Sequence, residues 1–406
     1  MNENIAYAGN KGEKVRSDCF VTLELRGRGG NDVDIQSKVG TLYGESIRDL
    51  AKDILQFYEV RSSRLEIEDS GALPFVIAAR IEAALKELIG PDEPYLLPMP
   101  EENKYGTRED RFRLSCLYLP GNTPKMMINA GIHHPNAIIL DLEDSVVPGK
   151  RKEARFLVRN ALRSVNFYGA ERMVRINRFP EGLKDLKYVV PHNVHVIIIP
   201  KCEVAEQVYE VEKEIHNIKE RHQTSNDIYM MPVIESANGV EHAFDIAGAS
   251  DEVVAMAIGL EDYTADIGAQ RTHSSYESFY ARSRIVNACR AAGIQPIDSV
   301  FSDVEDEEGL KAAARENKSL GFEGMGCIHP RQINPIYEGF APGEEEIEKA
   351  KKILDAAHEA EEKDLGVTAR GTQMIDPPVV KRAQSTLELG IYLGLVSENL
   401  RDKFIF

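Results

Sequence analysis

Two acidic residues, Glu235 and Asp262, each come at the end of an apolar segment and are the strongest candidates for metal chemistry. Glu235 directly follows the apolar residues 228–234, and Asp262 comes shortly after residues 253–258. Apolar runs of this length that end in a carboxylate are typical of buried parallel strands that deliver ligands to a site. Magnesium takes one or two such carboxylates and leaves its other positions to water and substrate. The alternative is that both residues cap the helices that follow them.

Eight short apolar runs follow one another in the chain, and segments long enough for a helix separate them. The runs cover residues 114–119, 137–142, 173–176, 194–199, 228–234, 253–258, 294–297 and 324–328. Eight strands that alternate with helices predict an α/β fold, a (β/α)8 TIM barrel. An open doubly wound sheet is the alternative, but residues 120–122 are a poor match to the glycine-rich phosphate loop of that fold.

Ionisable residues stand at or just after seven of the eight runs. In chain order they are Asp141, Glu143, Asp144, Arg175, Lys201, Glu235, Asp262, Asp298 and His329. In a barrel these positions converge on the C-terminal mouth, where such enzymes carry out their chemistry. The pattern therefore predicts an enzyme with its site at the mouth of the barrel.

The bulk composition limits the classes of partner. A net charge of −17 on 406 residues argues against nucleic acid or an anionic membrane, although a local basic pocket can still hold an anionic substrate. No apolar run reaches 18 residues, so no membrane-spanning helix is expected. The five cysteines are scattered and form no C-x-x-C motif, which fits a reducing compartment. We expect a cytoplasmic protein.

The chain is expected to contain three folded parts. Alternating strands and two amphipathic helices predict a small α+β domain in residues 1–90, and the proline-containing residues 91–111 are interpreted as a linker. The barrel is expected in residues 112–342. Residues 343–406 are predicted to form a helical extension that reaches a neighbouring subunit, which implies a homo-oligomer such as a trimer.

Seven motifs in the second and third parts carry a family resemblance. They are Leu117-Tyr-Leu-Pro-Gly-Asn122, Asp141-Leu-Glu-Asp144, Val174-Arg-Ile-Asn177, Ile199-Pro-Lys201, Ile234-Glu-Ser-Ala-Asn-Gly239, Ile328-His-Pro-Arg-Gln332 and Met374-Ile-Asp-Pro377. Together they resemble the citrate lyase β-subunit family, part of the HpcH/HpaI aldolase superfamily. The resemblance implies a Mg²⁺-dependent carbon–carbon lyase that cleaves a citryl-, citramalyl- or malyl-CoA type thioester, a 3-hydroxy-3-carboxyacyl compound. The products would be a 2-oxo acid and an acyl thioester.

The resemblance also implies roles for the central residues. Glu235 and Asp262 would hold the metal, and Arg175 would bind a carboxylate or carbonyl of the substrate through a bidentate contact. Asp376, supplied by a neighbouring subunit, would protonate the thioester enolate as a catalytic acid. For Arg175 the alternative is an ion pair with Asp141 or Glu143, and for Asp376 it is a turn-forming aspartate before a proline.

Three further residues are assigned supporting roles around that site. Glu143, as a catalytic residue, and Asp144 are expected to hydrogen-bond metal-bound water or Arg175, although Asp144 could equally be a helix N-cap. Lys201 is expected to contact a phosphate or carboxylate of the substrate. A solvated surface lysine is the alternative.

The N-terminal residues resemble the acyl carrier (γ) subunit of citrate lyase, at positions 17–24 and 71–85. In that subunit a serine directly before a Ser-Asp pair carries the CoA-derived prosthetic group, and here that position is Arg16. Ser17 is adjacent and remains the candidate for attachment. A second departure is Met325, where relatives commonly have a lysine near the CoA phosphates. The acyl group could therefore arrive on free CoA or on an acyl carrier.

Other functions remain open on the sequence. One is an aldolase acting on free 4-hydroxy-2-oxo acids, and another is a thioesterase in which metal-activated water attacks the same kind of substrate. A third, from a different class, is a non-catalytic subunit whose N-terminal domain docks partner lyase subunits.

Overall fold

The computed structural model describes residues 4–90, 93–272, 275–361, 368–370 and 373–404. The chain divides into two units, each described by itself. Unit 1 comprises Met1–Asp306 and Glu316–Ile333, and unit 2 comprises Glu307–Arg315 and Asn334–Phe406.

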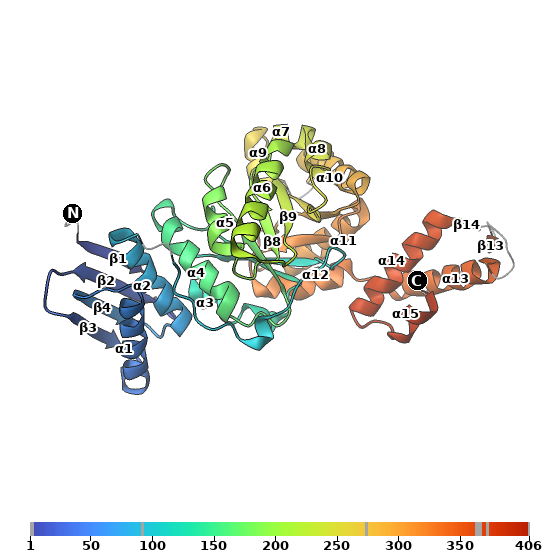
Figure 1. The fold of residues 1–406 in the computed structure, drawn as a ribbon. Helices are drawn as coiled ribbons and strands as arrows, with labels where there is room; N and C mark the ends of the chain where they lie inside the picture. Colours follow the sequence, from blue (N-terminus) through green and yellow to red (C-terminus); the bar gives the residue numbers. More distant parts are fainter. Residues whose placement is uncertain (1–3, 91–92, 273–274, 362–367, 371–372, 405–406) are drawn as a thin grey trace. The chain divides into compact units, whose positions relative to one another are not determined.

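Unit 1 contains a closed barrel of eight parallel strands, with helices around its outside (Figure 1). The strands are β5 (Ser115–Pro120), β6 (Ala137–Asp141), β7 (Glu171–Arg175), β8 (Val196–Ile199), β9 (Tyr229–Ile234), β10 (Ala255–Ile258), β11 (Gln295–Asp298) and β12 (Gly324–Cys327). They pair in chain order, and β12 closes on β5. Every strand starts and ends within two residues of its predicted run, so the predicted TIM barrel is confirmed.

Each strand is followed by helices or short 3-10 turns. The helices are α3 (Pro124–Met127), α4 (Arg151–Ser164), α5 (Leu183–Val189), α6 (Ala205–His222), α7 (Ala237–Glu241), α8 (Ala243–Ala247), α9 (Leu260–Asp266), α10 (Phe279–Ala292), α11 (Glu307–Leu320) and α12 (Ile333–Phe340). The interior of the barrel is filled by alternate strand residues such as Ile139, Met173, Ile198 and Met231. Because parallel strands in such a fold are buried on both faces, they read as continuous apolar runs, and this explains why the sequence predicted them.

The N-terminal residues form the expected small α+β domain. Its sheet has the order β1-β2-β4-β3 and consists of β1 (Ile5–Gly9), β2 (Cys19–Leu25), β3 (Asn31–Ser37) and β4 (Ser63–Asp69). Helices α1 (Gly40–Phe57) and α2 (Pro74–Leu88) pack on the sheet and on each other. Val21 and Leu23 on β2 and Leu65 and Ile67 on β4 are buried, which matches the two-residue period of strands with one face on the core.

The segment interpreted as a linker packs against the barrel over part of its length. Asn103 is buried and donates a hydrogen bond to the main-chain oxygen of Arg163. The ring of Tyr105 lies 3.9 Å from the Arg172 guanidinium, and its hydroxyl donates to the main-chain oxygen of Ala170. Residues 91 and 92 lie outside the described residues.

Unit 2 holds most of the C-terminal residues. Its elements are α13 (Glu344–Glu361), the hairpin β13 (Thr368–Arg370) and β14 (Gln373–Ile375), α14 (Pro377–Tyr392) and α15 (Asn399–Phe404). Leu354 on α13 and Leu387 on α14 are part of a small core of their own. Residues 362–367 and 371–372 of the predicted extension lie outside the described residues. Among the residues that the structure describes, none of the helices combines the length and apolarity that a membrane crossing requires.

Candidate active site at the mouth of the barrel

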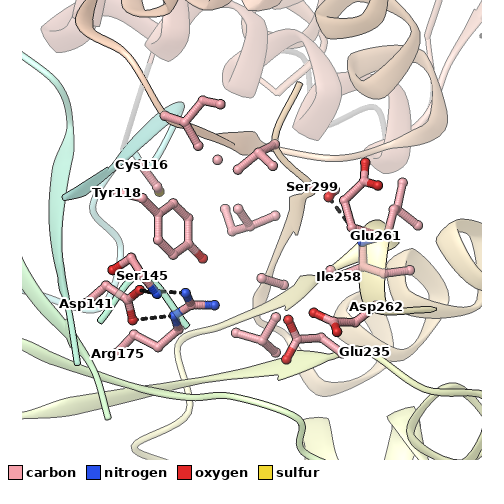
Figure 2. Close-up of a pocket in the computed structure, with 18 of the residues that line it drawn as sticks. Cys116, Tyr118, Asp141, Ser145, Arg175, Glu235, Ile258, Glu261, Asp262 and Ser299 are labelled. Atoms are coloured by element: carbon pink, nitrogen blue, oxygen red, sulfur yellow. Dashed lines mark hydrogen bonds and ion pairs between the residues drawn. The ribbon is translucent and has the colours of Figure 1, made fainter. Parts of the chain in front are cut away.

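A cavity of about 360 Å³ opens at the C-terminal ends of the barrel strands. We call it the mouth cavity, and its lining includes Tyr118, Asp141, Arg175, Glu235, Gly259, Asp262, Asp298 and Ser299. Figure 2 shows Arg175 and Asp141 on one side of the cavity and Glu235 and Asp262 on the other. The strand ends therefore bring together residues that lie up to 212 positions apart in the chain, from Cys116 to Ile328.

Glu235, directly after β9, is a buried carboxylate in the lining of the cavity. Its side chain is held by the main-chain N–H of Lys201, which donates to Oε2 at 2.8 Å. A Cβ on Gly259 would lie only 2.5 Å from Oε1, so any other residue at this position would force the carboxylate to move from where it lies. Burial raises the pKa of Glu235 to about 7, and the charge of Asp262 adds to this effect, while Lys201 and Arg175 oppose it.

Asp262 lies in the first turn of α9, and its side chain is half exposed at the rim of the cavity. Its Oδ2 is 3.7 Å from Nζ of Lys201. Neither acidic residue is a helix N-cap, because Ser236 occupies that position for α7 and Gly259 for α9. The alternative interpretation, in which Glu235 and Asp262 cap the helices that follow them, is therefore wrong.

These two carboxylates fit a divalent cation. Both supply hard oxygen donors to one cavity, and the absence of a side chain on Gly259 leaves space beside Oε1 of Glu235. The raised pKa of Glu235 shows that the protein alone does not compensate its charge, and a cation bound between the two residues would do so. Cavity space next to them can hold the water and substrate oxygens that Mg²⁺ keeps as further ligands.

Arg175, the last residue of β7, faces these carboxylates across the cavity. Its Nε and Nη2 donate to Oδ1 and Oδ2 of Asp141, both at 2.7 Å, and its Nη1 lies 3.4 Å from Oε2 of Glu143. Burial would raise the pKa of Asp141, but the hydrogen bonds and charge of Arg175 outweigh it and hold that pKa below its ordinary value. The ion pair between Arg175 and Asp141, the alternative that the sequence left open, is thus present. It uses the Nε and Nη2 edge of the guanidinium.

Lys201 is the centre of a cluster of charges beside this pair. Its Nζ lies 2.6 Å from Asp144 and 3.1 Å from Glu143, in addition to its contact with Asp262. Burial raises the pKa of Glu143, and the charges of Arg175 and Lys201 only partly oppose that rise. Lys201 is therefore not a freely solvated lysine, and Asp144 is not an N-cap, since Lys150 precedes α4.

Three other candidate residues have surroundings of their own. Asp376 belongs to unit 2, where it is the N-cap of α14 and its Oδ1 accepts a hydrogen bond from the main-chain N–H of Val379 at 3.2 Å. Ser17 lies in the N-terminal domain, half exposed, with a φ of 56°. His329 caps a 3-10 turn and is not among the residues that line the mouth cavity.

The sequence reasoning missed two residues that shape the cavity. Gly259 makes room for Glu235, and the hydroxyl of Ser299 accepts a hydrogen bond from the main-chain N–H of Leu260 at 3.1 Å, which fixes the start of α9. A glycine directly after an apolar run and just before an acidic pair was the available signal for Gly259. No sequence pattern pointed to Ser299.

Comparison with known proteins agrees with this architecture. Residues 114–330 match the model of the family "HpcH/HpaI aldolase/citrate lyase", and residues 7–88 match that of the malonate decarboxylase delta subunit, an acyl-carrier family. The citrate lyase subunit beta of Leuconostoc mesenteroides is 40% identical over 69% of this chain and 94% of its own length. The L-malyl-CoA/beta-methylmalyl-CoA lyase of Cereibacter sphaeroides is 30% identical over 66% of this chain and 91% of its own.

A solved structure gives the same result. The protein CitE from Mycobacterium tuberculosis, in complex with magnesium, acetoacetate and coenzyme A, is 28% identical, with a TM-score of 0.56. The match covers 70% of this chain and 99% of that one. The resemblance of both parts of the chain is confirmed, as is the prediction of a lyase. The chain belongs to the HpcH/HpaI aldolase/citrate lyase family.

Proposed function

We propose that this protein is a Mg²⁺-dependent carbon–carbon lyase that cleaves a 3-hydroxy-3-carboxyacyl CoA thioester to a 2-oxo acid and an acyl thioester. The observation that carries the proposal is the placement of Glu235 and Asp262 in one cavity, with Arg175 across from them. Relatives named as citrate lyase and malyl-CoA lyase subunits support it, and so does the related CitE structure with magnesium and coenzyme A.

In this proposal Glu235 and Asp262 hold Mg²⁺, which would supply Lewis-acid chemistry by lowering the pKa of the substrate hydroxyl. Lys201 holds Glu235 in place through its main-chain N–H and offsets the negative charge of Asp262 with its ammonium group. Arg175 binds a substrate carboxylate through Nη1, the nitrogen that does not contact Asp141. The two hydrogen bonds from Nε and Nη2 to Asp141 fix the orientation of the guanidinium.

The thioester enolate that leaves must gain a proton at carbon, and we assign this step to Asp376 of a second copy of the chain. Its carboxyl group is half-buried and accepts a hydrogen bond from the main-chain N–H of Val379, and in its protonated form it would donate the proton to carbon and end the step as a carboxylate. Under this assignment the working protein is a homo-oligomer, and Glu143 and Asp144 orient water and Lys201 beside the reacting centre.

The test measures the release of 2-oxo acid from citryl-, citramalyl- and malyl-CoA, with and without Mg²⁺. A coupled NADH-dependent dehydrogenase detects the 2-oxo acid as it forms. We expect cleavage of at least one thioester, and this activity should be lost when a chelator removes the Mg²⁺. In Glu235→Gln and Asp262→Asn, kcat/KM should fall roughly a hundredfold or more, because losing even an outer partner of a metal ligand costs about ten- to a hundredfold.

The matched control is Glu241→Gln, which removes a carboxylate from the exposed end of α7 and should leave the rate unchanged. Cleavage of no thioester would overturn the proposal. Release of pyruvate from a thioester-free 4-hydroxy-2-oxo acid alone would instead identify an aldolase. Wild-type behaviour of Glu235→Gln in a lyase complex would identify a docking subunit.

A further inference from the structure

The N-terminal domain is fixed to the barrel next to the mouth cavity. The loop of residues 11–17 connects β1 to β2, and Asn10 at its start donates to the main-chain oxygen of Asn122 at 3.3 Å and to Asp18 at 2.9 Å. Asp18 at its end forms two hydrogen bonds with Arg80, at 3.0 and 2.9 Å, and Arg80 also donates to the main-chain oxygen of Asn122. Both ends of this loop are therefore held at Asn122.

Asn122 belongs to the loop that follows β5, and this loop borders the cavity. Pro120, two residues earlier, and Met126, four residues later, both line the mouth cavity. Loops after barrel strands build the substrate site in this type of fold. The loop of residues 11–17 is thus anchored at a barrel loop whose neighbouring residues line the mouth cavity.

The contact between the two domains is stabilised by buried ion pairs. Arg159 on α4 donates to both carboxylate oxygens of Glu82 on α2, at 2.8 and 2.5 Å, and Asn160 donates to the main-chain oxygen of Phe75. Arg80, Glu82 and Arg159 are buried. Separating the domains would leave Glu82 and Arg159 without their ion-pair partners, which is strongly unfavourable. These contacts argue for a domain that stays docked on the barrel rather than for a carrier that swings between sites.

The loop carries positive charge in a strongly acidic protein. The loop contains three basic residues, Lys11, Lys14 and Arg16, and one acidic residue, Glu13. The whole chain, in contrast, has a net charge of −17. Lys11 pairs with Glu68 at 3.0 Å. Within the described part of the chain, neither Lys14 nor Arg16 forms an ion pair. Arg16 uses only Nη1, which donates to two main-chain oxygens of its own loop at 2.7 and 2.9 Å.

We infer that Lys14 and Arg16 bind the phosphate groups at the nucleotide end of a diffusible CoA thioester whose acyl end lies in the mouth cavity. The inference rests on the proposed function and names the form in which the substrate arrives. Arginine is suited to this contact because its planar guanidinium binds phosphate oxygens in pairs. An acyl group delivered on the chain's own N-terminal domain would need no such contact.

The experiment compares the wild type with the variant Lys14→Ala/Arg16→Ala on a CoA thioester and on the matching pantetheine thioester, which lacks the nucleotide. We expect KM for the CoA thioester to rise roughly tenfold with kcat unchanged, as expected for lost phosphate contacts that are equal in ground and transition states. KM for the pantetheine thioester should not change. The matched control is Arg28→Ala, an exposed arginine in the loop at the opposite end of β2.

A binding measurement separates failure of this inference from failure of the proposed reaction. Calorimetric titration with adenosine 3′,5′-bisphosphate needs no turnover, and we expect its affinity to fall roughly tenfold in the double variant only. Equal affinity in wild type and variant would overturn the inference, even for an active lyase. An equal KM change on both thioesters would also overturn it, as would a native mass that shows a prosthetic group on Ser17. A further result would be that inorganic phosphate binds as tightly as adenosine 3′,5′-bisphosphate and depends on Arg16 in the same way. That result would overturn the recognition of the nucleotide end.

Discussion

Metal binding to this protein should depend on pH through Glu235. The carboxylate must be ionised to hold a cation, and burial raises its pKa to about 7 in the metal-free protein. With that pKa, about a tenth of the molecules carry an ionised Glu235 at pH 6 and about nine tenths at pH 8. The apparent affinity for Mg²⁺ should therefore rise roughly tenfold between pH 6 and pH 8, or about 1.4 kcal/mol.

The sign of the effect on stability is opposite for the metal-free protein. Because the folded-state pKa of Glu235 lies above its ordinary value of 4.5, the group favours the folded state most at low pH. This contribution to the free energy of unfolding is lost as the pH rises from about 4.5 through about 7. Above that range the folded protein must hold Glu235 ionised and buried. Bound Mg²⁺ should restore stability above pH 7, because the cation binds the folded state only.

Isothermal titration calorimetry tests this directly. Titrations of Mg²⁺ at pH 6, 7 and 8, each in two buffers of different ionisation enthalpy, give both the affinity and the number of protons released. We expect proton release at pH 6 that disappears by pH 8. The variant Glu235→Gln should bind weakly with no dependence on pH over this range. An affinity that stays constant between pH 6 and 8 in the wild type would refute the reasoning.

Three further predictions concern single side chains. In Gly259→Ala the new Cβ would lie 2.5 Å from Oε1 of Glu235, so Mg²⁺ affinity should fall by roughly tenfold in a calorimetric titration. Arg175→Lys keeps the charge but loses the paired hydrogen bonds with Asp141, so kcat/KM should fall roughly a hundredfold in the thioester assay. Glu82→Ala leaves Arg159 buried without its partner, which should cost about 3 kcal/mol in urea unfolding of the whole chain.

The predictions for Gly259 and Glu82 each have a control with a different expected result. Gly248→Ala should bind Mg²⁺ normally, because its Cβ would meet nothing closer than 3.6 Å. Replacing Glu82 and Arg159 together by methionine should recover most of the lost stability, since no unpaired buried charge remains. Full activity of Arg175→Lys, or equal destabilisation by the single and double changes at Glu82 and Arg159, would show that these contacts do not act as described.

The barrel was predictable because its strands are buried on both faces, so each run reads as mainly apolar. Residues 137–140 and 196–199 show this most clearly. The convergence of carboxylates followed from the same reasoning, because parallel strands end at one mouth. Strand β1 was not predicted, since its sequence Ile-Ala-Tyr-Ala-Gly is short and includes small residues with weak strand preference.

The details that depend on distances could not be read from the chain. Arg175 could have paired with Asp141 or Glu143, and only the folded geometry shows that Asp141 takes both hydrogen bonds. Arg80 and Glu82 lie on a helix whose neighbouring residues are apolar, and their burial against the barrel depends on partners far away in sequence. The proline-containing segment before the barrel was interpreted as a linker because its composition does not reveal the packing of Tyr105.

The most direct test of the metal site is a crystal structure of the protein grown with Mn²⁺ and a 2-oxo acid, with the cation located by its anomalous scattering. The account predicts one strong anomalous peak within coordination distance of both Glu235 and Asp262, with the 2-oxo acid between the ion and Arg175. A cation bound elsewhere, with these two carboxylates contacting only protein and water, would contradict it.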